Sequence, residues 1–137
     1  MDAQFRPYRS LLYIPGSKAR ALEKARGLAV DAILFDLEDA VTPDAKADAR
    51  ETLKAALAEG GYGARAKIIR INGLDTPWGA EDVAALKDAG ADAFLLPKVN
   101  SAADIDALAA LLGNDTPIWA MMETPLAIFN AASIAAH

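Results

Sequence analysis

Short apolar runs recur along the chain and alternate with segments whose apolar residues are spaced three and four positions apart. Runs of this length with helical stretches between them indicate βα units, in which the strands are buried in a parallel sheet. The apolar spacing also gives two helical faces, around residues 49–57 and 105–112. The predicted strands cover residues 10–14, 32–36, 67–71, 93–97 and 118–122.

Helix boundaries are indicated by proline, serine and glycine. A threonine followed by proline is typical of an N-cap with Pro in the first helical position, and this pair occurs at 42–43, 76–77 and 124–125. Ser101 with Asp104 resembles a capping box. Helices are expected to end near Gly27, Gly60, Gly90 and Gly113.

Two architectures fit this repeat, namely a doubly wound open sheet or part of a (β/α)₈ barrel. A barrel takes about 250 residues for eight units. The five units in 137 residues have that pitch and stop three units short. An open sheet would be complete as it stands, but the first strand–helix turn, "IPGSKAR" at residues 14–20, lacks the G-x-G-x-x-G fingerprint.

Composition excludes several classes of function. The chain has a net charge of -5 and no basic run, which argues against nucleic acid and anionic membranes as partners. It has no cysteine, and its one histidine is His137, so thiolate chemistry, catalytic triads and His or Cys metal clusters are excluded. Without a signal core or a membrane-length apolar run, a soluble cytoplasmic protein is expected.

Polar and charged residues stand where the predicted strands end. In both candidate folds the carboxyl ends of parallel strands form the functional face, so these side chains are expected to meet at one rim. Residues two apart on a strand share a side, which pairs Asp36 with Glu38. The full set is Asp36, Glu38, Asp39, Arg70, Asn72, Lys98 and Glu123.

Each of these residues taken singly has a structural interpretation. Asp39 could be a solvated loop acid, Glu38 could pair with Lys98 for stability, and Arg70 could belong to a structural ion pair. The combination is more specific, because four strands deliver complementary charge to one rim. Oxygen ligands without His or Cys select a hard cation such as Mg²⁺. Glu123 would then bind the ion directly, and the acids after the second strand would hold its ordered waters.

Five sequence blocks carry a resemblance to a known family. They are "RSLLYIPGS", "FDLEDAV", "IRINGLDTPW", "LPKV" and "METP", in this order and across nearly the whole chain. The chain resembles the citrate lyase β-subunit and malyl-CoA lyase group of the HpcH/HpaI aldolase superfamily. The resemblance implies a (β/α)₈ TIM barrel, of which this chain supplies about the first five βα units. Because family members are longer, residues 1–137 are expected to be the truncated N-terminal part of a single barrel domain.

The resemblance also implies roles for the rim residues. Glu123 matches the first Mg²⁺ ligand, and the second ligand, an aspartate, is expected beyond the chain end. Arg70 matches the arginine that binds the oxygens of an α-keto acid. Glu38 and Asp39 match acids that reach the metal through water, and Lys98 is expected to pair with them. Arg70, Glu38, Asp39 and Lys98 therefore form the predicted catalytic set.

Coenzyme A is expected to bind near the first rim loop. Tyr13 and Lys18 match positions that contact the coenzyme in the family, and Lys24 is a looser candidate. Asn72, on the same side of its strand as Arg70, completes the predicted substrate-binding set.

The activity that the resemblance implies is that of a Mg²⁺-dependent carbon–carbon lyase. Such an enzyme cleaves or forms a bond between an acyl-CoA enolate and a 2-keto acid, with citryl-CoA, malyl-CoA or citramalyl-CoA as the thioester. The full-length form is expected to be a homo-oligomer, a trimer or hexamer. Three alternatives stay open: a thioesterase acting on malyl-CoA-type thioesters, a Schiff-base aldolase with Lys98 as nucleophile, and a non-catalytic half-barrel assembly partner.

Overall fold

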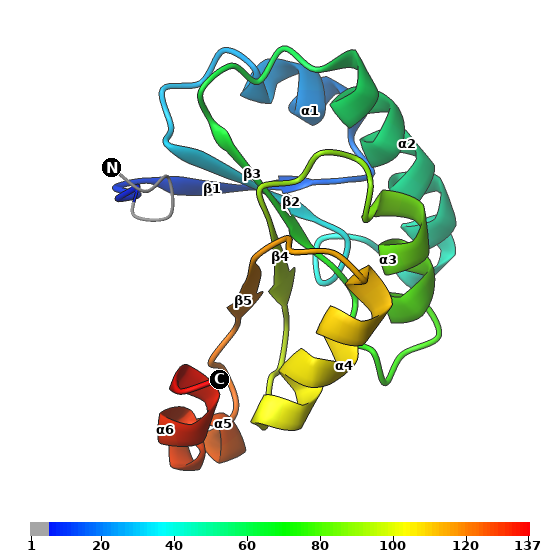
Figure 1. Cartoon of the computed structure of the whole chain (residues 1–137). Coiled ribbons are helices and arrows are strands. Elements are labelled where there is room, and N and C mark those ends of the chain that lie inside the picture. Colours follow the sequence, from blue (N-terminus) through cyan, green and yellow to red (C-terminus); the bar gives the residue numbers. More distant parts are fainter. Residues whose placement is uncertain (1–5) are drawn as a thin grey trace.

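A computed structural model describes residues 6–137, which form alternating strands and helices (Figure 1). The strands are β1 (Leu11–Pro15), β2 (Ala32–Asp36), β3 (Ala66–Arg70), β4 (Ala93–Leu96) and β5 (Ile118–Ala120). The helices are α1 (Ala19–Ala25), the short 3₁₀ helix η2 (Pro43–Ala45), α2 (Lys46–Glu59), α3 (Gly79–Leu86), α4 (Ala102–Leu112), α5 (Pro125–Phe129) and α6 (Ala131–Ala135). No helix in this part of the chain is both long enough and apolar enough to cross a bilayer.

The order of the strands decides between the two predicted architectures. In residues 6–137 the sheet has the order β1-β2-β3-β4-β5, and every neighbouring pair is parallel. A doubly wound sheet reverses its strand order at a switch point, which this sheet does not do. Successive crossovers in one direction place the helices on one face, as Figure 1 shows for α2, α3 and α4. The structure is thus the wall of a (β/α)₈ barrel, which confirms the predicted fold class.

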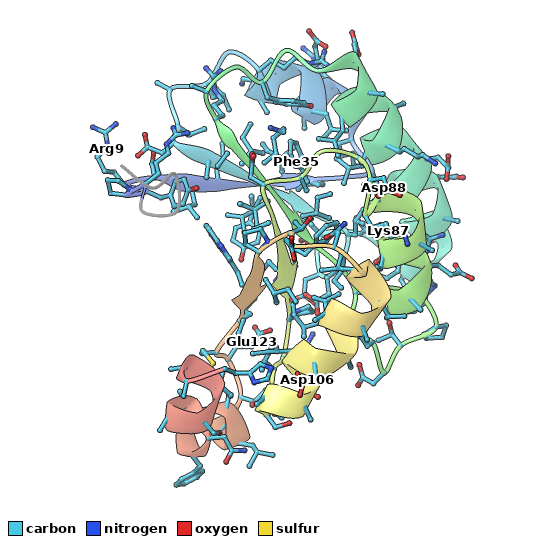
Figure 2. The ribbon with its side chains drawn as sticks, in the orientation of Figure 1. Arg9, Phe35, Lys87, Asp88, Asp106 and Glu123 are labelled. Carbon is cyan, nitrogen blue, oxygen red and sulfur yellow. The ribbon has the colours of Figure 1, made fainter. Side chains whose placement is uncertain are left out.

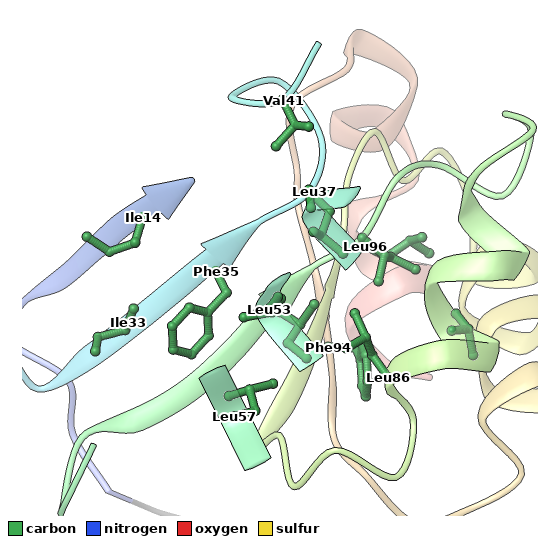
Figure 3. Close-up of a cluster of buried hydrophobic side chains, with 14 of the residues drawn as sticks. Ile14, Ile33, Phe35, Leu37, Val41, Leu53, Leu57, Leu86, Phe94 and Leu96 are labelled. Atoms are coloured by element: carbon green, nitrogen blue, oxygen red, sulfur yellow. The ribbon is translucent and has the colours of Figure 1, made fainter. Parts of the chain in front are cut away.

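The two faces of the sheet carry separate hydrophobic clusters among the described residues. The larger cluster lies between the strands and the helices, where Phe35 and Phe94 meet Leu53 and Leu86 (Figure 3). Burying one such side chain contributes about 1.5–3 kcal/mol, so this layer holds the helices to the sheet. The smaller cluster faces the barrel interior and consists of Ala32, Leu34, Ala66, Ile68, Ala93 and Leu95.

Burial differs between central and edge strands, which corrects one expectation from the sequence. All five runs were expected to be continuously buried, and β2 and β4 are buried along their whole length. Residues 11–13 of β1 are exposed, however, and β5 is half-buried. The reason is position, because β1 and β5 each have one neighbouring strand in the sheet whereas β2 to β4 have two.

Most of the predicted helix boundaries are confirmed. Thr124 caps α5 by accepting the N–H of Ala127, and the capping box at the start of α4 forms as expected. One prediction is wrong, because α3 begins at Gly79 and not at Pro77. The chain first turns at residues 73–76, where the Thr76 N–H donates to the Gly73 carbonyl. A Cβ on Gly79 would lie only 2.4 Å from the Gly73 oxygen, so the helix start packs tightly on that turn.

Candidate active site

A bidentate ion pair between Asp36 and Arg70 lies at the carboxyl ends of β2 and β3. Arg70 donates from Nε to Asp36 Oδ1 at 2.8 Å and from Nη2 to Asp36 Oδ2 at 2.7 Å. The two residues are register partners on adjacent parallel strands, so their side chains project from the same place on the sheet. Both side chains are buried, which makes the pair costly to break.

The Asp36 carboxylate also receives backbone hydrogen bonds. The N–H groups of Glu38 and Ala40 donate to it at 2.9 and 3.0 Å, so the carboxylate shapes the loop that follows β2. Burial alone would raise the pKa of Asp36, but the bonds from Arg70 and the two amides outweigh it and hold the pKa below its ordinary value. The ionised form of Asp36 is therefore favoured, and protein donors already occupy its oxygens.

Glu38 lies between the two cations of the site. One of its oxygens is 3.2 Å from Arg70 Nη1, and the other pairs with Lys98 Nζ. The Glu38 side chain is only 9% exposed, whereas that of Asp39 is 72% exposed and lies 4.0 Å from Lys98 Nζ. The predicted catalytic set of Glu38, Asp39, Arg70 and Lys98 is therefore brought together at one rim. Its catalytic role stays a prediction.

Lys98 links three strands through two different groups. Its side chain pairs with Glu38 after β2, and this contact raises the pKa of the ammonium. Its backbone N–H donates to Glu123 Oε1 at 2.8 Å, which reaches the end of β5. The residue adopts a φ of 51°, a left-handed conformation that costs a side-chain-bearing residue free energy. An ammonium whose pKa is raised by Glu38 is poorly suited to forming a Schiff base, which needs a neutral amine.

Tyr13 places an aromatic ring against the guanidinium. The Arg70 carbon Cζ lies 4.9 Å from the centroid of the Tyr13 ring, within the range of a cation–π contact. Arg70 Nη1 also lies 3.7 Å from the Met121 sulfur. Tyr13, which is 44% exposed, therefore packs its ring against the guanidinium of Arg70.

The structure separates the remaining predicted binding residues. Lys18 is exposed in the turn after β1, at the start of α1 and thus at the rim. Lys24 lies in the last turn of α1, on the way back from the rim, and is not brought to the site. Asn72 is buried, and its Nδ2 donates to the Leu37 carbonyl at 2.9 Å and to Asp82 at 2.7 Å. Its amide hydrogens are thus engaged within the protein, and its contact with substrate stays a prediction.

A pocket of about 460 Å³ opens beside this cluster. Its walls come from the loops after β2, β3 and β4, so it lies at the carboxyl rim where the sequence predicts the site. Both polar and apolar side chains line these walls, the latter including Val41 and Trp78. The charged and amide-bearing residues that line the pocket are Glu38, Asp39, Lys46, Asn72, Asp75 and Lys98.

The oxygen donors of this rim suit a hard divalent ion in part. Glu123, exposed between β5 and α5 (Figure 2), uses one oxygen for the Lys98 amide, and Asp39 is open to solvent. Within residues 6–137, no three acidic, histidine or cysteine side chains are grouped as a metal site. Mg²⁺ often takes only one or two carboxylates and keeps several waters, so Glu123 fits as one ligand of an incomplete set.

Some residues of this region were missed or undervalued by sequence reasoning. Asp36 was recognised as a rim acid but not as the fixed partner of Arg70, because the register that pairs them is set by the folded sheet. Lys46 and Arg50 were not singled out. They share helical spacing with Leu53 and Leu57, and charges within an apolar helical face are a signal that such side chains have buried partners.

The comparisons with known proteins agree with this geometry. The family model for HpcH/HpaI aldolase/citrate lyase matches residues 9–137. The chain belongs to the HpcH/HpaI aldolase/citrate lyase family. A solved member, the protein CitE of Mycobacterium tuberculosis in complex with magnesium, acetoacetate and coenzyme A, has a TM-score of 0.78 and 29% identity. It covers 96% of this chain, and this chain covers 46% of it.

Curated relatives within the family point to different reactions. A (3S)-malyl-CoA thioesterase of Cereibacter sphaeroides is 60% identical over all 137 residues, which are 48% of that protein. The citrate lyase β subunit of Leuconostoc mesenteroides is 36% identical, with 93% of this chain and 45% of that protein aligned. The chain thus spans about half the length of these HpcH/HpaI relatives.

These comparisons correct the main functional expectation. The sequence was expected to encode a carbon–carbon lyase, with a malyl-CoA thioesterase as an alternative. That main expectation is wrong, because thioesterases match at 58–60% identity over the entire chain while the lyase-type relatives are more distant and partly aligned. The family itself, its barrel fold and its link with magnesium and coenzyme A ligands in solved members stand as predicted.

Proposed function

We propose that the whole protein containing this chain hydrolyses a malyl-CoA-type thioester to the free acid and coenzyme A. The observation that carries this proposal is the 60% identity to a (3S)-malyl-CoA thioesterase, in an alignment that extends over all 137 residues. Residues 1–137 would form the N-terminal part of one barrel domain and supply part of its active site.

The reaction adds water to a thioester carbonyl and expels a thiolate. Negative charge develops on the carbonyl oxygen as the carbon–oxygen bond forms, and the malyl group already carries a carboxylate. A site for this reaction needs fixed positive charge that water does not screen. Arg70 meets that requirement, because its side chain is buried and Asp36 holds it in place. Lys98, whose side chain is 59% exposed, would add a second cation that Glu38 holds.

Arg70 would face the substrate with only part of its guanidinium. Nε and one Nη2 hydrogen donate to Asp36, so the edge that normally grips a carboxylate in a bidentate fork is already taken. Nη1 also lies 3.2 Å from Glu38, so the Nη hydrogens that are not directed at these two acids would bind the substrate carboxylate or the developing oxyanion. Asp36 and the ring of Tyr13 would keep that edge aimed at the ligand.

Glu123 would hold a magnesium ion together with ligands from outside residues 6–137. When bound, the ion would supply Lewis-acid polarisation of a carbonyl and charge for the oxyanion. The Lys98 amide fixes the Glu123 carboxylate through one oxygen and leaves the other for the ion. Asp39, exposed at the same rim, would bind ordered water near it.

Coenzyme A would lie over the first rim loop. Lys18 is exposed there and would pair with a phosphate of the coenzyme, while Tyr13 lies between that loop and Arg70. Lys24 is a weaker candidate because it lies about 1.7 helical turns beyond Lys18.

The test is an assay of the whole protein with malyl-CoA and Mg²⁺ that measures two products. Free thiol would report hydrolysis, and acetyl-CoA with glyoxylate would report carbon–carbon cleavage. We expect free thiol to equal consumed thioester, with loss of activity on addition of EDTA. Release of acetyl-CoA and glyoxylate without free thiol would contradict the proposal.

A further inference from the structure

A buried lysine lies directly behind the candidate active site. Lys46 begins α2 and is only 6% exposed, yet it lines the rim pocket together with Glu38 and Asn72. Its Nζ donates to the carbonyl of Leu37 at 3.0 Å and to the carbonyl of Glu38 at 2.9 Å. The ammonium also lies 5.0 Å from the centroid of the Trp78 ring. A buried charge costs free energy unless it is partnered, so such contacts call for an explanation.

A second set of hydrogen bonds, beside that of Lys46, starts one turn further along α2 at Arg50. Arg50 Nε donates to Asp82 Oδ1 at 3.0 Å, and Asp82 on α3 is fully buried. Asp82 Oδ2 accepts the backbone N–H and the Nδ2 of Asn72, at 2.9 and 2.7 Å. Asn72 Nδ2 in turn donates to the Leu37 carbonyl.

The two sets of hydrogen bonds, from Lys46 and from Arg50, meet at the Leu37 carbonyl oxygen and so close a ring with α2. Leu37 O accepts from Lys46 Nζ and from Asn72 Nδ2, which arrive from α2 and from the loop after β3. The ring therefore joins α2, α3 and the exits of β2 and β3 around the peptide that precedes Glu38. On the other side of that peptide, the Glu38 carboxylate lies between Arg70 and Lys98.

We propose that Lys46 is a positioning residue for the site, which acts by holding the Leu37 and Glu38 carbonyls and so fixes where the Glu38 carboxylate lies. The Lys46 ammonium is engaged by these two backbone oxygens, so its assigned role is to position Glu38 and not to act on the substrate. The inference rests on the proposed function for its effect on turnover, but its effect on the loop is independent of the reaction.

A purely structural role would have a different signature. Substituting a residue that only stabilises the fold lowers the melting temperature and leaves the turnover of the folded enzyme unchanged. Substituting a residue that positions Glu38 also lowers kcat in protein that is fully folded, because a displacement of about 1 Å in an active site can cost about 100-fold in rate. It also loosens the loop after β2 without loosening the strand itself.

The decisive variant is Lys46→Met, which keeps the aliphatic stem against Trp78 and removes the ammonium. Lys54→Met is the matched control, since Lys54 is exposed on the same helix and the change in net charge is identical. In the whole protein, below the melting temperature of each variant, we expect Lys46→Met to lower kcat about 10- to 100-fold with KM changed less than about threefold. Lys46→Arg, which retains the charge and the donors, should recover most of the lost kcat.

Hydrogen exchange supplies a readout that does not depend on activity. The amides of Glu38 and Ala40 bind the Asp36 carboxylate, so they report the order of this loop. In Lys46→Met they should exchange about tenfold faster or more, while core amides of β2 follow global stability. If the wild-type protein hydrolyses no thioester, the proposed function fails, but this exchange result still decides the positioning role.

The same measurements can overturn the inference. Wild-type kcat and wild-type exchange at Glu38 and Ala40 in folded Lys46→Met would show that Lys46 does not position the loop. If Lys46→Met does not fold, Lys46→Gln, which removes the charge and shortens the side chain but keeps a polar end group, is measured in its place. Unchanged loop exchange in that variant would equally reject the proposal.

Discussion

Asp36 and Arg70 occupy paired positions on β2 and β3, so the register of the sheet itself forms the buried ion pair at the centre of the candidate site. Three consequences follow from one geometry. The guanidinium plane is fixed, the Asp36 carboxylate is neutralised, and its oxygens organise the loop that carries Glu38. The clustering of acids after β2 is thus balanced by cations from β3 and β4.

Removing Arg70 should affect stability as well as activity. Arg70→Met leaves Asp36 buried without its cation, and we expect a loss of about 3–5 kcal/mol in the free energy of unfolding. The double variant Asp36→Asn/Arg70→Met should lose less than the two single variants added together, by about 1–3 kcal/mol. Urea unfolding measures both quantities, with the exposed Arg20→Met as control. Strict additivity would show that the pair contributes no coupling.

The pH dependence of stability should reflect Asp36. Its folded pKa lies below the ordinary value of 3.8, so the stabilising contribution is present above that pH and is lost as pH falls toward the folded pKa. We expect Asp36→Asn to be less stable than wild type at pH 7 and to show a smaller loss between about pH 4 and pH 2. Denaturant melts at each pH test this, with Asp48→Asn as the control for loss of a surface carboxylate. Parallel pH profiles would contradict it.

Lys98 combines a strained backbone with a charged side chain, and two substitutions separate these properties. Lys98→Ala and Lys98→Gly both remove the ammonium, so both should lower turnover. Glycine relieves the left-handed φ of 51°, so Lys98→Gly should exceed Lys98→Ala in unfolding free energy by about 1 kcal/mol. At Lys87, where φ is -57°, alanine should be the more stable of the two. If alanine were more stable than glycine at both positions, that result would argue against strain at Lys98.

Glu123 should determine the affinity for Mg²⁺ but contribute little to the stability of the fold. Glu123→Gln keeps an oxygen for the Lys98 amide but removes the charge that attracts a divalent ion. In the whole protein we expect the Mg²⁺ concentration for half-maximal activity to rise about tenfold or more, with little change in melting temperature. Calorimetric titration with Mg²⁺ checks the affinity, and the exposed Glu51→Gln serves as control. Unaltered Mg²⁺ dependence would remove Glu123 from the ligand set.

The sequence was most informative where one periodic signal dominates. The predicted strands lie within one or two residues of the observed ones, and the rim acids and bases meet as expected. These outcomes follow from local apolar runs and from the rule that parallel strands share their carboxyl edge. The start of α3 was missed because the turn at Gly73 and the close packing of Gly79 depend on atoms brought together by the fold.

Contacts between separate elements were beyond the reach of local patterns. The bidentate pairing of Asp36 with Arg70 depends on register, and the ring through Lys46 depends on how α2 and α3 approach the sheet. The choice between cleavage and hydrolysis was also missed, because both chemistries use the same family motifs.

Hydrolysis in ¹⁸O-labelled water tests the central claim most directly. The whole protein is incubated with malyl-CoA and Mg²⁺ in the labelled water, and the mass of the acid product is measured by mass spectrometry. Attack of water on the thioester carbonyl predicts malate carrying one ¹⁸O in its new carboxylate, in step with released coenzyme A. Acetyl-CoA and glyoxylate as the products, with no labelled malate, would contradict the account.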